Sequence, residues 1–298
     1  MKKYSALSLV MVLFSSLLIV ACKKDRIEEP EEQPEAKTEY ASADEYFDSK
    51  KTEEQEFVIE NEDGTDPITG KEGTKIYISK NCLEFPNGDT VGFPYTVKLV
   101  ELYKPIDMVF WEMPTVSNSK ILDTDGEVRV RAFKDGTELQ LNGNCPVKVE
   151  LPNTNPDPKM EVYLGEGSDP VNWVSTNTNF DTTYFGYSAN INKLGWINVD
   201  KLPDPGVHTI TYESDSAILT NVKIFIYFPS LGGVMQVYDQ ESYLIPDAYS
   251  IKTFCIAVDA SKNLFYFNSD LTISSDVTLN VLLSPVTDPD LTTYLNGL

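Results

Sequence analysis

The sequence predicts an all-β protein with two antiparallel β-sandwich-like domains, and three observations lead to that prediction. From about residue 70 the chain consists of short runs rich in branched and aromatic residues, separated by Gly, Pro, Asn and Asp. Several of these runs alternate apolar and polar residues with the period of two that a half-buried strand requires. No stretch keeps the 3.6-residue period of a helix, apart from a candidate last helix over residues 288–295.

Individual strands and one hairpin follow from the same patterns. Residues 127–132 (EVRVRA) and 146–151 (PVKVEL) alternate, which predicts one buried and one solvated face, as antiparallel sheets allow. Residues 96–103 (TVKLVELY) and 222–228 (VKIFIYF) are apolar on both faces and suit central strands. Asp-Gly at residues 135–136 lies between such runs and predicts a hairpin turn.

The first 22 residues have the pattern of an export signal. A basic head precedes an uncharged run over residues 4–20, and a small residue and Cys22 follow. The run at residues 18–22 (LIVAC) resembles the lipobox of bacterial lipoproteins, whose cysteine is acylated. We therefore expect a signal peptide over residues 1–21 and a palmitate-type lipid on Cys22 that holds the protein in the outer membrane, facing the cell exterior. The alternative is an uncleaved anchor helix, for which the apolar run is barely long enough.

An acidic segment follows the cysteine. Residues 23–66 hold 17 acidic and six basic residues, with two prolines among glutamates and few branched or aromatic side chains. Such a composition cannot bury enough apolar surface to fold, so we expect residues 22–69 to be the lipidated Cys and a flexible, disordered tether. The alternatives are an acidic interaction tail and a cation-binding run.

A Pro-rich segment and the cysteines organise the rest of the chain. Residues 152–158 (PNTNPDP) cannot lie in a paired strand, which predicts a β-sandwich domain over residues 70–155 and a second β-rich domain over residues 156–298. Cys82 and Cys145 each lie beside a strand of the first domain and are the candidates for a disulfide in an oxidising envelope. The alternative is that both, and Cys255, are separate buried thiols.

Composition argues against several functions. A formal charge of −22 disfavours nucleic acid as a partner. The single histidine, His208, has no Ser or Cys motif to act with and is expected at the surface. Residues 123–127 (DTDGE) have the oxygen density of a calcium turn but lack the ligand ladder of a helix-loop-helix site, so a plain turn is expected. We assign no catalytic residue, no cofactor and no metal ligand.

Residues 72–202 resemble a group of Bacteroidetes surface lipoproteins of unassigned function. The motifs are Phe-Pro-Asn-Gly at 85–88, Asp-Met at 107–108, Pro-Thr at 114–115 and Gly-Glu-Val at 126–128, followed by a "GWIN-D" block at 194–200 (LGWINVD). A fainter similarity is to the β-sandwich of ankyrins and netrin receptors. Both resemblances imply a structural or interactive role rather than a catalytic one.

The tryptophans separate the functional hypotheses. Trp111 and Trp196 have apolar neighbours and are expected in the core, whereas Trp173 follows a Gly/Asp/Pro turn and is the candidate for stacking on a ligand at the surface. We expect a lipid-anchored cell-envelope protein with a non-catalytic binding or scaffolding role. Its expected partners are the membrane, through the lipid on Cys22, and a protein or glycan at the cell surface. The second hypothesis is a surface carbohydrate-binding lipoprotein of a glycan-uptake system. The third is an envelope glycoside hydrolase, for which no carboxylate pair stands out among 46 acidic residues.

Overall fold

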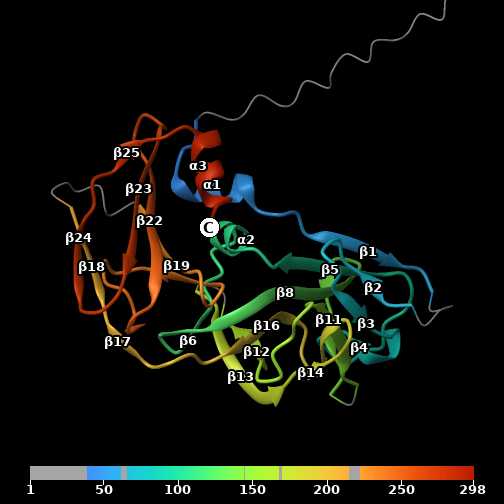
Figure 1. The fold of residues 1–298 in the computed structure, drawn as a ribbon. Coiled ribbons are helices and arrows are strands. Elements are labelled where there is room, and N and C mark those ends of the chain that lie inside the picture. Colours follow the sequence, from blue (N-terminus) through green and yellow to red (C-terminus); the bar gives the residue numbers. More distant parts are fainter. Residues whose placement is uncertain (1–38, 62–65, 144, 168–169, 215–221) are drawn as a thin grey trace, which may run out of the picture. The chain divides into compact units, whose positions relative to one another are not determined.

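The structure, a computed structural model, describes residues 39–61, 66–143, 145–167, 170–214 and 222–298. Strands account for 50% of the chain and helices for 10%, which confirms the all-β prediction. The described residues belong to one compact unit (Figure 1). Within these ranges no helix has the length and apolar character needed to cross a membrane. The predicted signal peptide and Cys22 lie outside the described residues.

The first sandwich contains two facing sheets. The larger sheet has the order β1 (Gln55–Ile59), β5 (Tyr95–Leu102), β8 (Asp123–Lys134), β16 (Gly195–Lys201), β12 (Glu161–Glu166) and β13 (Asn172–Asn179), with β9 (Thr137–Glu138) paired to β8. The smaller sheet has the order β14 (Asp181–Thr182), β15 (Gly186–Ile191), β11 (Val147–Pro152), β3 (Lys75–Tyr77) and β2 (Ile68–Thr69). Beside them, β4 (Leu83–Glu84), which follows the short 3₁₀ helix η1 (Lys80–Cys82), pairs with β10 (Gln140–Leu141). The space between the two sheets is the first core.

The second sandwich is built around one five-stranded sheet. Its order is β20 (Gly233–Val237), β19 (Val222–Phe228), β22 (Ser250–Val258), β23 (Leu264–Thr272) and β25 (Ser284–Pro285). Three two-stranded units complete the fold: the parallel pair β18 (Ile210–Glu213) and β24 (Val277–Asn280), the pair β17 (Gly206–His208) and β21 (Ile245–Pro246), and the hairpin β6 (Val116–Ser117) and β7 (Lys120–Ile121). Ile210 and Tyr212 of β18 pack with Ile224 and Ile226 of β19 in the second core.

The strands have the burial patterns and the central positions that the sequence predicts. Val128 and Val130 of β8 are fully buried in the first core, whereas Arg129 and Arg131 lie on the opposite face. The strands over residues 96–103 and 222–228 are central, because β5 pairs with β1 and β8 and β19 pairs with β20 and β22. Asp135 and Gly136 both have positive φ and join β8 to β9 in the predicted hairpin.

A middle core packs the outer face of the larger first sheet against the outer face of the five-stranded sheet. Three helices contribute to it: α1 (Ala43–Lys50), α2 (Pro105–Phe110) and the predicted last helix, α3 (Asp288–Leu295). Figure 1 shows these helices close together. Phe47 of α1 stacks on Phe225 of β19, and Phe225 stacks on Phe254 of β22, each with ring centroids 5.6 Å apart. The two sandwiches therefore share a continuous aromatic interior.

The domain boundary predicted at residue 155 does not coincide with a break in the sheets. β8 pairs with β16, and β11 pairs with β15, so both sheets of the first sandwich take strands from either side of the Pro-rich segment. That segment ends β11 at Pro152 and carries the chain to β12 in the opposite sheet. Proline stops strand pairing, but the chain then returns to the same core.

The tether predicted over residues 22–69 is wrong for its second half. Tyr40, Tyr46 and Phe47 are at most 1% exposed, and β1 pairs with β5 along its whole length. Ser42 caps α1 by accepting a hydrogen bond from the Glu45 backbone N–H. The prediction rests on the average charge of the segment and gives too little weight to these aromatic residues, each of which buries a large apolar area. Residues 23–38 of the predicted tether lie outside the described residues.

The cysteines divide into a pair and a single thiol. Cys82 and Cys145, the candidate pair, form a disulfide with their Cα atoms 5.0 Å apart. Cys255 is free and fully buried in the second core, where burial raises the pKa of its thiol to about 12. A buried, protonated thiol is chemically inert, so Cys255 acts as a small apolar residue.

Candidate functional site

The main candidate site is a cavity of about 750 Å³ between α1, the end of α2, residues 170–171 before β13 and the edge of the five-stranded sheet. Its wall is mostly polar. The lining side chains include Asp44, Trp111, Glu112, Lys223, Gln236 and Tyr238. Because Asp44 and Tyr238 are exposed, a ligand can reach the cavity from solvent.

Local structure positions these side chains. Pro105 at the first turn of α2 fixes the start of that short helix, and Trp111 forms its C-cap. Glu112 follows with φ of +50°, a left-handed conformation that a non-glycine residue adopts at a cost of about 1 kcal/mol. This turn directs the chain away from the helix and places Glu112 beside β19 and β20.

A chain of polar contacts orders the cavity wall. The Lys223 ammonium lies 2.7 Å from both the Asp44 and the Glu112 carboxylate. Burial lowers the pKa of Lys223, but its bonds to the two carboxylates outweigh that effect, so the net shift is upward and the amine stays charged. Gln236 donates to Glu112 over 3.1 Å, and the Tyr238 hydroxyl donates to Gln236 over 3.1 Å. The wall therefore presents ordered donors and acceptors.

The prediction for Trp173 is wrong. Its side chain is 0% exposed, and its indole N–H donates to the Pro114 carbonyl over 2.9 Å, so it cannot stack on a ligand at the surface. Trp111 and Trp196, expected in the core, are the half-buried ones. Pro170, three residues earlier, is exposed, but β13 follows with the Trp173 side chain facing the middle core.

The three tryptophans nevertheless meet in one cluster. The ring of Trp196 lies 5.9 Å from that of Trp111 at 78°, and 6.5 Å from that of Trp173 at 84°. The Arg129 guanidinium lies 4.9 Å from the Trp111 ring and 5.1 Å from the Trp196 ring. Edge-to-face rings with a cation against them form no flat platform for a sugar. Only Trp111 of the three lines the cavity.

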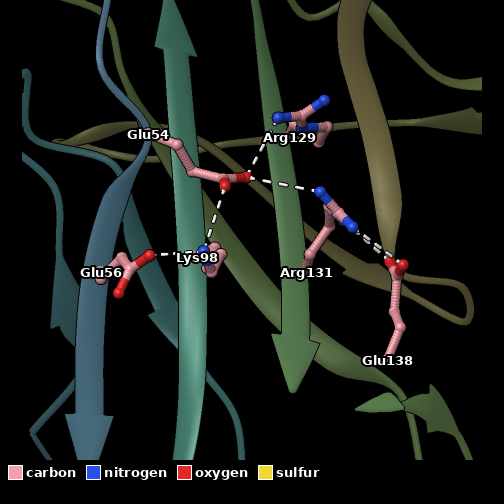
Figure 2. A network of polar contacts seen from close by, with 6 residues as sticks. All are labelled: Glu54, Glu56, Lys98, Arg129, Arg131 and Glu138. Atoms are coloured by element: carbon pink, nitrogen blue, oxygen red, sulfur yellow. Dashed lines mark hydrogen bonds and ion pairs between the residues drawn. The ribbon is translucent and has the colours of Figure 1, made fainter. Parts of the chain in front are cut away.

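An ion-pair network covers the exposed part of the outer face of the larger first sheet. Figure 2 shows Glu54, just before β1, pointing toward Lys98, Arg129 and Arg131 on β5 and β8. Its shortest link is to Arg129, over 3.0 Å. Arg131 also forms two parallel bonds of 2.9 Å with Glu138. Glu54, Glu56 and Glu138 together balance the three cations on this face, so the network ties the N-terminal segment to the sheet rather than offering a free basic patch.

A second polar cluster, missed by the sequence analysis, lies inside the molecule. Glu127 of β8 and Asp200 of β16 are both 0% exposed, and burial raises the pKa of each carboxyl well above its usual range. The turn expected over residues 123–127 is instead the start of β8. Gly126, which resembles a turn residue in the sequence, has φ of +127° and accommodates an irregularity in the pairing with β16.

His208 lies at the edge of the second sandwich, partly exposed, with its ring 3.2 Å from Asp247. It does not line the cavity. Among the residues that the structure describes, no group of three or more His, Cys, Asp or Glu side chains is arranged to hold a metal ion.

No protein-family model matches this chain, and no curated protein or solved structure is significantly similar to it.

Proposed function

We propose that this protein is a lipid-anchored cell-envelope protein with a non-catalytic binding role, and that its ligand occupies the cavity beside α1. The observation that carries the proposal is the ordered polar wall from Asp44 to Tyr238, which closes one side of a cavity large enough for a small molecule. The resemblance to surface lipoproteins supports the same role.

The cavity favours a saccharide as the ligand, which is the narrower form of the proposal. Sugar hydroxyls pair with fixed carboxylates and amides, and the apolar face of a sugar ring packs on an aromatic side chain. The wall supplies the carboxylates of Asp44 and Glu112, the amide of Gln236, and the exposed ring of Tyr238. This arrangement supports a glycan partner at the cell surface.

The hydrolase hypothesis has less support at this site. A retaining or inverting glycosidase needs one carboxyl group to donate a proton and a second to act as nucleophile or base. Both carboxylates in the wall, Asp44 and Glu112, are instead bonded to the same Lys223 ammonium. The geometry therefore favours binding over bond cleavage.

Ligand-observed NMR with a panel of envelope and dietary oligosaccharides tests the binding role. We expect at least one saccharide to bind, and Tyr238→Ala to weaken its binding about tenfold or more. Tyr184→Ala is the matched control, because Tyr184 is exposed and does not line the cavity. If no saccharide binds, or if both variants behave alike, the ligand assignment fails.

The lipid anchor has a separate test. A fatty-acid probe supplied to cells should label the wild-type protein, and Cys22→Ala should abolish both the label and the membrane attachment. Membrane attachment of the alanine variant with its signal uncut would instead indicate an anchor helix.

A further inference from the structure

Two carboxyl groups are fully buried in the middle of the larger sheet. Both oxygens of Glu127 and both oxygens of Asp200 lack a hydrogen bond within the described part of the chain. Asn198, also 0% exposed, pairs directly with Glu127 across the strands, and its Nδ2 lacks a partner there too. Buried polar atoms in native proteins are nearly always satisfied. Five unsatisfied atoms on three neighbouring side chains therefore indicate a missing occupant.

The backbone brings these side chains to one face. The register between β8 and β16 shifts, so that Asn198 pairs with Glu127 whereas Asp200 pairs with Thr124. This bulge, with Gly126 at φ of +127°, places Thr124 and Glu127 on the same face although they are three residues apart. Thr124 lies beside the cluster and donates its hydroxyl to the Asn198 amide oxygen over 3.0 Å.

Within the part of the chain that the structure describes, no cationic side chain compensates the two carboxyl groups. Arg129, two residues after Glu127 on the same strand, is bonded to Glu54 over 3.0 Å. Lys201, next to Asp200, lies 3.0 Å from Asp123 and 2.6 Å from Asp157. A pair of fully buried carboxylates without a counter-charge is strongly unfavourable, so the cluster must hold either a cation or protons.

We propose that Glu127, Asp200 and Asn198 form a binding site for one calcium ion. All available donors are oxygen atoms, since no His or Cys belongs to the cluster, and hard oxygen sites suit calcium rather than zinc. The charge of a divalent ion matches two carboxylates. Rotating the Asn198 amide by half a turn turns its carbonyl oxygen toward the carboxyl groups and lets its NH₂ donate to Thr124, and the two orientations are indistinguishable by shape. Calcium accepts such irregular mixtures of carboxylate and amide oxygens, whereas magnesium requires a near-ideal octahedron and several waters.

The site lies where the two sandwiches meet. The Thr124 backbone N–H donates to the Leu231 carbonyl in the turn between β19 and β20, over 2.9 Å. Bound calcium would therefore hold β8 and β16 together directly beneath a contact with the second sandwich. With only two carboxylates, the expected dissociation constant is that of extracellular calcium modules, about 10⁻⁴–10⁻³ M.

Calorimetry and thermal denaturation of the chelator-treated full-length protein test the proposal. We expect one calcium ion to bind per chain and to raise the melting temperature, with no comparable effect of magnesium. Glu127→Gln and Asp200→Asn, which preserve shape, should each weaken calcium binding about tenfold or more. Asp270→Asn, an exposed acid on β23, should leave binding unchanged.

Three results would contradict the proposed calcium site. The first is a wild-type protein that binds no calcium. The second is an equal response to magnesium, which would indicate general charge screening. The third is a Glu127→Gln variant that still binds calcium like the wild type. Should the variants fail to fold, the calcium and magnesium titrations of the wild type still decide the question.

Discussion

Lys50 in α1 and Asp288 at the start of α3 form an ion pair with the ammonium 2.7 Å from the carboxylate, although the two residues are 238 positions apart. The Tyr40 hydroxyl donates to the same carboxylate over 2.5 Å, and Thr292 donates to its other oxygen. The segment before β1 is thus fastened to the last helix of the chain. Since α1 also lines the cavity, the stability of this contact bears on the proposed binding role.

Removing the Asp288 charge should destabilise the protein. Asp288→Asn leaves Lys50 without its partner and weakens two further hydrogen bonds, so we expect a loss of about 2 kcal/mol in the free energy of unfolding. Chemical denaturation measures this loss, and Asp270→Asn, at an exposed position, should change stability by less than about 0.5 kcal/mol. Equal effects of the two substitutions would mean that the pair contributes nothing.

The same contact should give a defined pH dependence. Burial raises the pKa of Asp288, but the bonds from Lys50, Tyr40 and Thr292 outweigh it and leave the pKa below its ordinary value. A carboxyl with a lowered pKa stabilises the fold above its unfolded pKa, about 3.9, and this stabilisation is lost as the pH falls through the folded value. The stability difference between wild type and Asp288→Asn should be complete at pH 6 and shrink below about pH 4. A difference that stays constant down to pH 3 would contradict the shift.

The tryptophans should rank by burial. Trp173→Ala empties a fully buried site and removes the bond to Pro114, so it should cost about 3–5 kcal/mol. Trp111→Ala, at a half-buried position, should cost about 1–3 kcal/mol. Thermal melts of the two variants test the order, and a greater loss at Trp111 would show that Trp173 is not the core residue.

The disulfide should contribute strongly to stability. Cys82 and Cys145 close a loop with a sequence separation of 63, for which the chain-entropy relation gives about 4 kcal/mol. The Cys82→Ala/Cys145→Ala double variant should lose an amount of this order in denaturant titrations. Peptide mapping without reductant should recover the two cysteines cross-linked and Cys255 as a free thiol. Three free thiols in the folded protein would contradict the pairing.

The strand pattern of this fold could be predicted from local sequence, because period-two burial leaves a direct signature in runs such as residues 127–132. Local sequence does not show which strands, from distant parts of the chain, pack around the same core. The Pro-rich segment at 152–158 predicts a domain boundary, but in the structure the chain crosses there to the opposite sheet of the same sandwich. The high charge of residues 23–66 likewise predicts a disordered segment, although Tyr46 and Phe47 within it are buried. Their burial depends on distant partners such as Phe225, which the local sequence does not show.

The candidate site was less accessible to sequence analysis, because its residues come from α1, the end of α2 and two strands of the second sandwich. Nothing in the local sequence connects Asp44 to Lys223 or Glu112. For Trp173, the turn before it suggested exposure, whereas the orientation of β13 decides its burial. The positive φ of Glu112 also has no marker in the sequence, since glycine would be the residue expected there.

Blocking the cavity with a covalent label tests the binding proposal most directly. Tyr238→Cys, modified with a bulky maleimide, fills the cavity from its exposed side, and Tyr184→Cys carries the same label at an exposed position that does not line the cavity. The calorimetric dissociation constant of a saccharide that binds the wild type is then measured for both labelled proteins. We predict that the label at residue 238 abolishes binding and that the label at residue 184 leaves it unchanged. Undiminished binding with the label at residue 238 would place the ligand elsewhere and contradict the proposal.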